Sequence, residues 1–518
     1  MGMVRRVVGS RAGRAPVVAL DAESTVPMYE QICTAVRDQI VRGSLRPGAR
    51  IASTRTLASE LAVSRFTVVT ALERLVAEGY LTARRGSGSY VADVLPEQVM
   101  RPAVWKGGRN AIARQATPPS ISRRGAALAA VVITGPRAEA GPRPFHPRRP
   151  ALDVFPIRLW ARLAARHWRS ARPGDLDYGD PAGFMPLRRA IAEHIAVSRG
   201  VRCDPHQVIV TSGAQQAFDM LFRLLLDPGD QVWMEEPGYL DVRAALVGAG
   251  ATLVPVPVDR EGLDVAAGMS RAPDARLAVV SPSHQYPAGA TLSARRRAAL
   301  LEWARRAGAW IVEDDYDSHF RYRGRPVPAL QRFDCDTAGA VAPRVVYVGT
   351  FSKTMFPALR LGFCVVPEML VDAATNARAV ASRNAPMADQ AVLATFISEG
   401  HYDRHLRRAR LVYEERYEAM RRAVARELSG MLAVTRAAAG THLLAWFAPG
   451  TRQHAASARY APRIARACAE DNLVIFPVSR YWLEPPERDG FVLGYGGVSP
   501  RQIATGAAAL ARVIARVR

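Results

Sequence analysis

The chain has 518 residues, of which 49% are hydrophobic and 23% are charged, and its formal net charge is +23. This composition is typical of a globular protein rather than a disordered one, and the chain is too long for one compact core, so we expect two or more domains. No run of about 18 uncharged apolar residues occurs, and the arginine-rich N-terminus lacks the apolar core of a secretory signal, which predicts a cytoplasmic protein without a membrane partner.

The positive charge favours a polyanionic partner, although arginine is abundant along the whole chain. The five cysteines have neither the spacing of metal ligands nor that of a disulfide framework. We therefore expect reduced thiols and no metal site.

Three helices and a hairpin are predicted near the N-terminus. The first helix is indicated by apolar residues at helical spacing, Ile32, Val36 and Ile40. Ser53 or Thr54 can cap a second helix and Ser64 a third, and two short helices that meet at a tight turn are typical of a helix-turn-helix. Two short apolar segments, 80–82 and 89–91, flank the basic, glycine-rich tip 84–88, so we expect a wing.

Between residues 93 and 150 the periodicity fades, and ten Arg and Lys stand against three Asp and Glu. This composition predicts a basic linker rich in Pro, Gly and Arg. Its one apolar stretch, 126–133, could form a short element.

From residue 151 onward, helical segments alternate with short β-rich runs. The runs are 208–210, 232–234, 253–255, 277–280, 310–312, 345–348 and 361–366. This alternation predicts an α/β fold with a mainly parallel sheet covered by helices on both faces. Ligands of such sheets bind beyond the carboxyl ends of the strands.

Three motifs follow these runs. Thr211 to Ala217 opens a helix, whose N-terminus can bind a phosphate. The acidic run 313–317 ends another strand, and taken alone it also fits solvated carboxylates beside arginines. Lys353 is one of only two lysines in the chain, and it follows an apolar run and precedes Arg360 by seven residues. An amine can condense with an aldehyde, whereas a guanidinium cannot, so Lys353 is a candidate nucleophile.

Together these motifs resemble the fold-type I pyridoxal 5'-phosphate (PLP) enzymes of the aminotransferase superfamily. The resemblance implies that Lys353 forms a Schiff base with PLP, that Asp314 pairs with the pyridine nitrogen and that Tyr316 bonds the ring hydroxyl. It also implies that Tyr239 stacks on the ring with Tyr286 nearby. The residues that match its phosphate cup are Gly213, Ala214, Gln215, Ser352 and Arg360. Tyr178 matches a tyrosine that reaches the neighbouring subunit's cofactor, which implies a homodimer.

Two positions depart from the pattern of the enzymes. Tyr286, in the string His284-Gln285-Tyr286-Pro287, stands where plain aminotransferases have asparagine. The arginine that grips a substrate carboxylate would fall at Val492, and Arg480 remains a possible substitute. Without that clamp, ordinary turnover of amino acids is not expected.

The N-terminal module resembles the winged helix-turn-helix of GntR-type repressors. The resemblance implies that the DNA-binding residues are Arg55, Ser64, Arg65, Thr67, Arg84 and Gly86.

Nearly the whole chain resembles the MocR/GabR family of PLP-dependent transcriptional regulators. We therefore predict a DNA-binding domain at 25–92, a basic linker at 93–150 and a PLP-binding aminotransferase-like domain at 151–518. The partners implied are double-stranded DNA and a small-molecule effector, which is an amine, an amino acid or PLP itself. The missing carboxylate arginine favours an amine or PLP. The alternative is an active aminotransferase that carries a DNA-binding domain, and a regulator with residual transaminase-like activity lies between the two.

Overall fold

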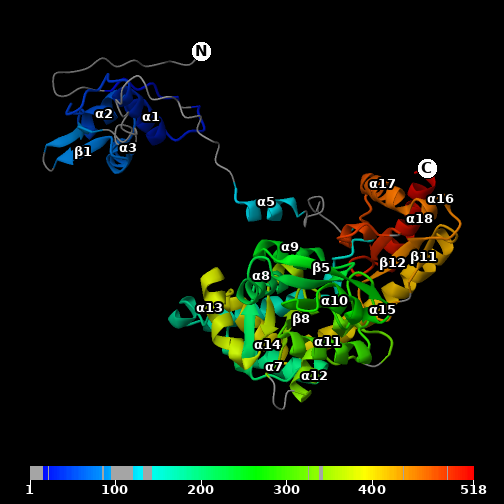
Figure 1. Ribbon diagram of the computed structural model, residues 1–518. Helices are drawn as coiled ribbons and strands as arrows, with labels where there is room; N and C mark the ends of the chain where they lie inside the picture. Colours follow the sequence, from blue (N-terminus) through cyan, green and yellow to red (C-terminus); the bar gives the residue numbers. More distant parts are fainter. Residues whose placement is uncertain are drawn as a thin grey trace, which may run out of the picture. The chain divides into compact units, whose positions relative to one another are not determined.

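The computed structural model describes residues 16–21, 23–84, 87–94, 121–131, 143–324, 326–337, 342–435, 437–486 and 488–517. The chain divides into two compact units, Met1–Pro119 and Ser120–Arg518. We call their described residues the head and the body (Figure 1). Within these residues, no helix is both long enough and apolar enough to span a membrane.

The head contains the predicted helix-turn-helix and hairpin. Its elements are α1 (Met28–Val41), α2 (Thr54–Leu61), α3 (Arg65–Ala77), β1 (Leu81–Arg84) and β2 (Gly88–Val91). Ser53 caps α2 by accepting the N–H of Thr56 at 3.2 Å, and Ser64 caps α3 by accepting that of Thr67 at 3.0 Å. The structure thus selects Ser53 over Thr54, and a core that includes Ile32, Val36 and Ile40 holds the helices together.

The body is built on an eight-stranded sheet with the order β3-β10-β9-β8-β7-β4-β5-β6. Its strands are β3 (Val208–Thr211), β4 (Gln231–Glu236), β5 (Thr252–Asp259), β6 (Gly262–Leu263), β7 (Leu277–Val280), β8 (Trp310–Asp315), β9 (Val345–Thr350) and β10 (Gly362–Val365). Neighbours from β5 through β9 pair in parallel, whereas β10 and β6 pair antiparallel with their neighbours. The mainly parallel sheet predicted from the sequence is confirmed, with all seven of its predicted strands.

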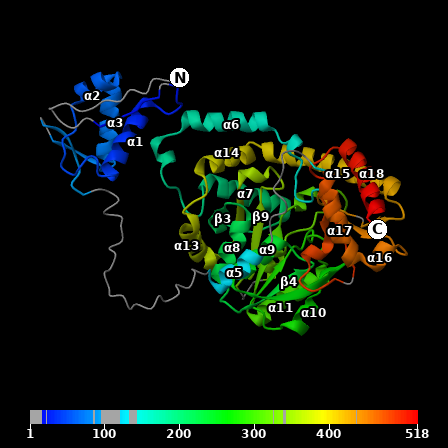
Figure 2. The same cartoon turned by 90° about the horizontal axis from the view of Figure 1, so that it is seen from above.

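Helices cover both faces of this sheet because its buried side chains alternate between them. On β9, Val345 and Tyr347 join the clusters of one face, and Val346 and Val348 join the cluster of the other. The first face carries α7 (Met185–Arg199), α10 (Val265–Arg271), α11 (Ala294–Ala307) and α14 (Met387–Ser398); the second carries α8 (Ala214–Leu225), α9 (Leu240–Ala249) and α13 (Val371–Ser382). Two further helices are α6 (Ile157–Ser170), which packs on α14 as α7 does (Figure 2), and α12 (Leu330–Thr337).

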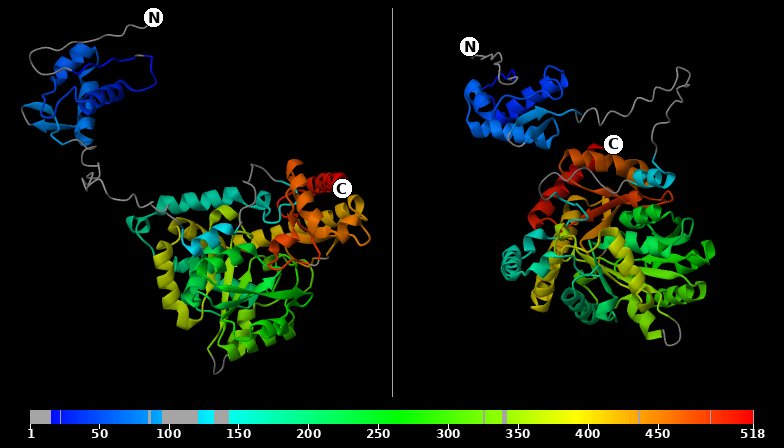
Figure 3. Two further views of the ribbon diagram at one scale, coloured as in Figure 1. Left: turned by 45° about the horizontal axis from the view of Figure 1, so that its top comes forward. Right: turned by 90° about the vertical axis from the view of Figure 1, so that its left-hand side faces the viewer.

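A second, antiparallel sheet of the body has the order β11-β12-β14-β13 and was not predicted. Its strands are β11 (Leu432–Val434), β12 (His442–Phe447), β13 (Phe476–Pro477) and β14 (Gly490–Gly494). They pack with α15 (His401–Glu427), which is yellow to gold in Figure 3, and with α17 (Ser457–Glu470) and α18 (Pro500–Arg516), which are orange to red. The short α16 (Arg452–Ala455) adjoins β12.

Two segments of the predicted linker pack on the body. Helix α5 (Arg123–Ala130) contacts α9. Further on, Phe145 is fully buried and forms a β-bridge with Gly494. A Cβ at Gly494 would lie 2.2 Å from the carbonyl oxygen of His146, so glycine permits this close approach. Residues 143–150 are therefore fixed by contacts with the C-terminal sheet.

Candidate functional site

A cavity of about 280 Å³ opens in the body. It lies where ligands of parallel sheets bind, because Asp314 and Thr350 stand at the carboxyl ends of β8 and β9. Its lining residues are Pro147, Arg148, Ala214, Gln215, Phe218, Tyr239, Asp241, Tyr286, Asp314, Tyr316, Thr350, Ser352, Lys353, Pro357, Arg360, Thr441 and His442. All the predicted cofactor residues except Gly213 and Tyr178 are among them.

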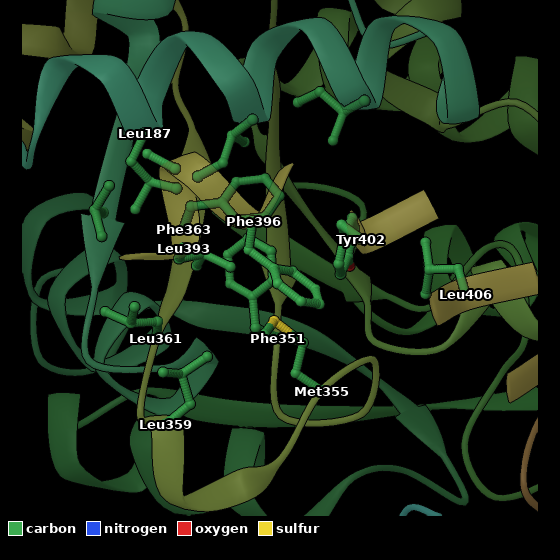
Figure 4. Close-up of a cluster of buried hydrophobic side chains, with 14 of the residues drawn as sticks. Leu187, Phe351, Met355, Leu359, Leu361, Phe363, Leu393, Phe396, Tyr402 and Leu406 are labelled. Carbon is green, nitrogen blue, oxygen red and sulfur yellow. The ribbon is translucent and has the colours of Figure 1, made fainter. Parts of the chain in front are cut away.

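Lys353 is held by a loop that is anchored in the core. Phe351 and Met355 on either side of it are buried, and they pack in one apolar cluster with Leu359 and Leu361 (Figure 4). The Lys353 Nζ donates a hydrogen bond to the carbonyl oxygen of Arg148 at 2.7 Å. The amine is thus fixed at the cavity wall.

Burial is the main cause and the nearby Arg148 guanidinium the second, and together they lower the pKa of Lys353 to about 8. A lysine with this pKa supplies a larger share of neutral amine near pH 7 than an ordinary lysine does. The neutral amine is the nucleophilic form.

We expect the acetylation rate of Lys353 to rise about tenfold per pH unit below its pKa and to level off above about pH 8 to 9. The reason is that only the neutral amine reacts, and its fraction saturates once the pH exceeds the pKa. Trace labelling with acetic anhydride and peptide mass spectrometry measure this rate. The control is Nα-acetyllysine, whose free ε-amine has an ordinary pKa. A rate that still rises tenfold between pH 9 and pH 10 would contradict the expectation.

The acidic run at the end of β8 is buried rather than solvated. Three of its carboxylates have partners: Glu313 accepts the backbone N–H groups of Leu330 and Gln331, Asp315 pairs with Arg199 at 2.6 Å, and Asp317 contacts His284 at 3.0 Å. Asp314 is 5% exposed, lines the cavity, and has no hydrogen-bond or ion-pair partner for its carboxylate among the described residues.

Burial raises the pKa of Asp314 well above its ordinary value, and the charges of Asp315 and Glu235 raise it further. An unpartnered carboxyl group in this setting favours its neutral form. A positively charged N–H group that enters the cavity would supply the missing partner and favour the carboxylate.

Three tyrosines line the cavity, and each has a partner for its hydroxyl group. Tyr316 Oη lies 3.0 Å from His284 Nδ1, Tyr286 Oη lies 2.9 Å from Tyr481 Oη, and Tyr239 donates to Asp241 at 2.9 Å. The rings of Tyr239 and Tyr286 meet edge to face, with centroids 5.5 Å apart. These contacts fix the rings in place, so that a flat ligand would meet preorganised aromatic walls.

One end of the cavity suits a phosphate. Gly213 precedes α8 in the left-handed region with a φ of 97°, and a Cβ there would lie 3.0 Å from Arg360 Nη2. Arg360 donates to the carbonyl oxygen of Ser212 at 2.9 Å, which holds its guanidinium beside the N-terminus of α8. Free backbone N–H groups and a guanidinium at one point are typical of anion binding.

The structure does not bring every predicted residue to the cavity. Tyr178 is 78% exposed and lies against the Arg383 guanidinium. Val492 is fully buried in an apolar cluster with Tyr286, Leu444 and Tyr481, and Arg480 lies over the ring of Phe476. Neither position adds a guanidinium to the cavity lining.

Sequence reasoning missed Arg148, Thr441 and His442, which also line the cavity. Arg148 lies in the segment that composition assigned to a linker, and no local signal distinguished it from its neighbours.

In the head, the predicted DNA-binding residues lie on α2, at the start of α3 and at the end of β1. Arg55, Arg65 and Arg84 are exposed and form no ion pair with any described residue. By contrast, Arg37 and Arg74 both pair with Glu78. Ser64 and Thr67 form the cap of α3, and Gly86 lies outside the described residues. Phe66 is 79% exposed beside Arg65 and was not predicted as a contact.

Comparisons with known proteins agree with this architecture. Residues 28–91 match the family of bacterial regulatory proteins called gntR, and residues 152–481 match aminotransferase class I and II. The probable rhizopine catabolism regulatory protein MocR of Rhizobium meliloti is 40% identical over 492 residues, which are 95% of this chain and 94% of that protein. The chain belongs to the MocR family.

Other relatives support the same assignment. The HTH-type transcriptional regulator TauR of Rhodobacter capsulatus is 34% identical over 92% of this chain and 95% of its own length. Among solved structures, the alpha-aminoadipate aminotransferase LysN of Thermus thermophilus has a TM-score of 0.67 and 27% identity, over 77% of this chain and 97% of that chain. The predicted family and fold class are confirmed. For this MocR-family chain, a gntR-type head implies DNA binding, and the named relatives favour a transcriptional regulator over the alternative of an active aminotransferase.

Proposed function

We propose that this MocR-family regulator holds PLP covalently at Lys353 and that a small molecule bound beside the cofactor sets its affinity for promoter DNA. The observation that carries the proposal is that two groups line one cavity: Lys353, whose pKa is lowered to about 8, and the carboxyl group of Asp314, which has no hydrogen-bond or ion-pair partner among the described residues. The aminotransferase class I and II family and the LysN complex with N-(5'-phosphopyridoxyl)-L-leucine support the choice of cofactor.

The cavity residues fit PLP group by group. When bound, PLP supplies an aldehyde that condenses with a neutral amine and a ring whose protonated nitrogen withdraws electrons. Lys353 presents the amine, and Asp314 accepts a hydrogen bond from the ring N–H. Tyr316 forms a hydrogen bond with the ring hydroxyl, while Tyr239 and Tyr286 lie against the ring.

The residues of the predicted phosphate cup hold the phosphate. They are Gly213, Ala214, Gln215, Ser352 and Arg360. Arg360 provides the countercharge, and the N-terminus of α8 provides backbone N–H donors.

The regulator acts as a cytoplasmic homodimer in this proposal. Tyr178 is 78% exposed and does not line the cavity of its own chain, which is consistent with a contact across a subunit interface. A dimer presents two heads, each within residues 25–92, to repeated or inverted half-sites. An effector changes DNA affinity only if it binds the two arrangements of the dimer with different affinities.

We expect PLP to change the Kd for DNA about fivefold or more, because typical couplings between two sites span about 5- to 150-fold. Full-length protein freed of cofactor is first used to select duplexes from a random library. Gel retardation then measures the Kd with PLP, without it, and with pyridoxine 5'-phosphate, which keeps the phosphate but lacks the aldehyde. If all three Kd values agree, and added amines and amino acids leave them unchanged, cofactor-linked regulation is excluded.

A further inference from the structure

Three cationic side chains line the cavity, and the proposed function uses only two of them. Lys353 serves the aldehyde and Arg360 the phosphate, whereas Arg148 has no part in cofactor binding. His442 also lines the cavity, but burial and the neighbouring His284 lower its pKa well below its ordinary value, so its ring is neutral. Arg148 is thus the remaining positive charge of the cavity lining.

The backbone of Arg148 is fixed next to the reactive amine. Phe145 is bridged to Gly494, Pro147 is buried, and the Arg148 carbonyl oxygen accepts the hydrogen bond from Lys353 Nζ at 2.7 Å. Because both residues line one cavity, a molecule that places its own amine near Lys353 can also contact the Arg148 side chain.

The guanidinium is positioned but not saturated. Its Nη2 bonds the Tyr239 hydroxyl at 3.0 Å and pairs with Asp241, while Nε and Nη1 have no partner in the part of the chain that the structure describes. The side chain is 33% exposed, and it faces the cavity. An arginine keeps its charge and offers a planar fork of donors that matches a carboxylate.

Apart from Lys353 and Arg360, which the cofactor uses, the lining has no other arginine or lysine. The position of the enzymes' carboxylate arginine is occupied by Val492, which is buried among apolar side chains. Asp241 offsets part of the charge of Arg148 and occupies its Nη2, so it competes with a bound anion for this guanidinium.

We infer that Arg148 is the specificity-determining residue of the effector site and that the effector is an amine carrying a carboxylate or another anionic group at its far end. This inference rests on the proposed function, since it takes Lys353 and Arg360 as already used by the cofactor. It reverses the expectation, drawn from Val492, of an effector without a carboxylate.

The test compares ω-amino acids with alkylamines of matching chain length. Cofactor-loaded full-length protein is titrated with each compound, and half-saturating concentrations come from the absorbance spectrum and, independently, from gel retardation of DNA. We expect at least one acid to bind about tenfold or more tightly than its matched amine, as a charge-assisted hydrogen bond predicts. Arg148→Gln should abolish this preference. Arg149→Gln is the matched control, because it removes the same charge from a neighbour outside the cavity lining, and this variant should keep the preference for the acid.

The inference is overturned if no acid is preferred by the wild-type protein, or if Arg148→Gln keeps the preference. Should Arg148→Gln fail to fold by circular dichroism, Asp241→Asn decides the question. Removal of this competing carboxylate should tighten acid binding several-fold and leave amine binding unchanged, and unchanged acid binding overturns the inference. Failure of the wild-type protein to attach PLP at Lys353 would instead refute the proposed function itself.

Discussion

Lys353→Ala should abolish covalent attachment of PLP and remove its effect on DNA affinity, so that the ratio of the Kd values with and without PLP falls from about fivefold or more to one. The chain has one other lysine, Lys106, and arginine cannot condense with an aldehyde. No side chain of the cavity can therefore replace the missing amine. Borohydride reduction followed by peptide mapping measures attachment, and gel retardation measures the Kd.

Lys106→Ala is the matched control, because it removes the only other lysine, which lies outside the described residues. It should retain both attachment and response. Lys353→Ala should still bind the selected duplex, since the head does not include the cavity. A visible cofactor band that survives in the washed Lys353→Ala protein would show that another group forms the bond.

The local signals in the sequence were sufficient for the head and for seven of the eight strands of the large sheet. Ser53 and Ser64 mark helix starts through bonds to residues three positions later, and strands such as β7 and β9 contain apolar runs of four residues. The C-terminal sheet was not predicted, although β12 and β14 are mostly apolar. Its β11 has three residues and its β13 only two, Phe476–Pro477, which are too short to show an alternating pattern.

The same distinction applies to the site. Lys353, Asp314 and the turn before α8 could be predicted because each follows a recognisable strand. The partners of the acidic run could not, because Asp315 and Arg199 are 116 residues apart in the chain. Arg148 lies 205 residues from Lys353, in a segment without periodicity that only tertiary contacts hold in place. Composition alone could not separate it from a linker.

The double change Arg55→Ala and Arg65→Ala should weaken binding of the selected duplex about 100-fold or more, since a lost contact to a base costs about 1–3 kcal/mol and a lost phosphate contact also weakens binding. Both side chains are exposed and have no ion pair within the described part of the head, so their charge is available to DNA. Arg65 also begins α3, the helix expected to enter the major groove. Gel retardation of the full-length protein at several salt concentrations measures the effect.

Arg295→Ala with Arg306→Ala is the matched control, because it removes two exposed charges from α11 of the body and should leave DNA binding unchanged. The single variants then distinguish the two kinds of contact. An arginine bound to a phosphate should weaken binding equally for all sequences and reduce the salt slope by about 0.9, whereas one bound to a base should relax the preference at one position of the site. If the double variant and its control bind the duplex equally well, the head does not contact DNA through Arg55 and Arg65. The DNA-binding residues must then lie on another part of the head, such as the wing formed by β1 and β2.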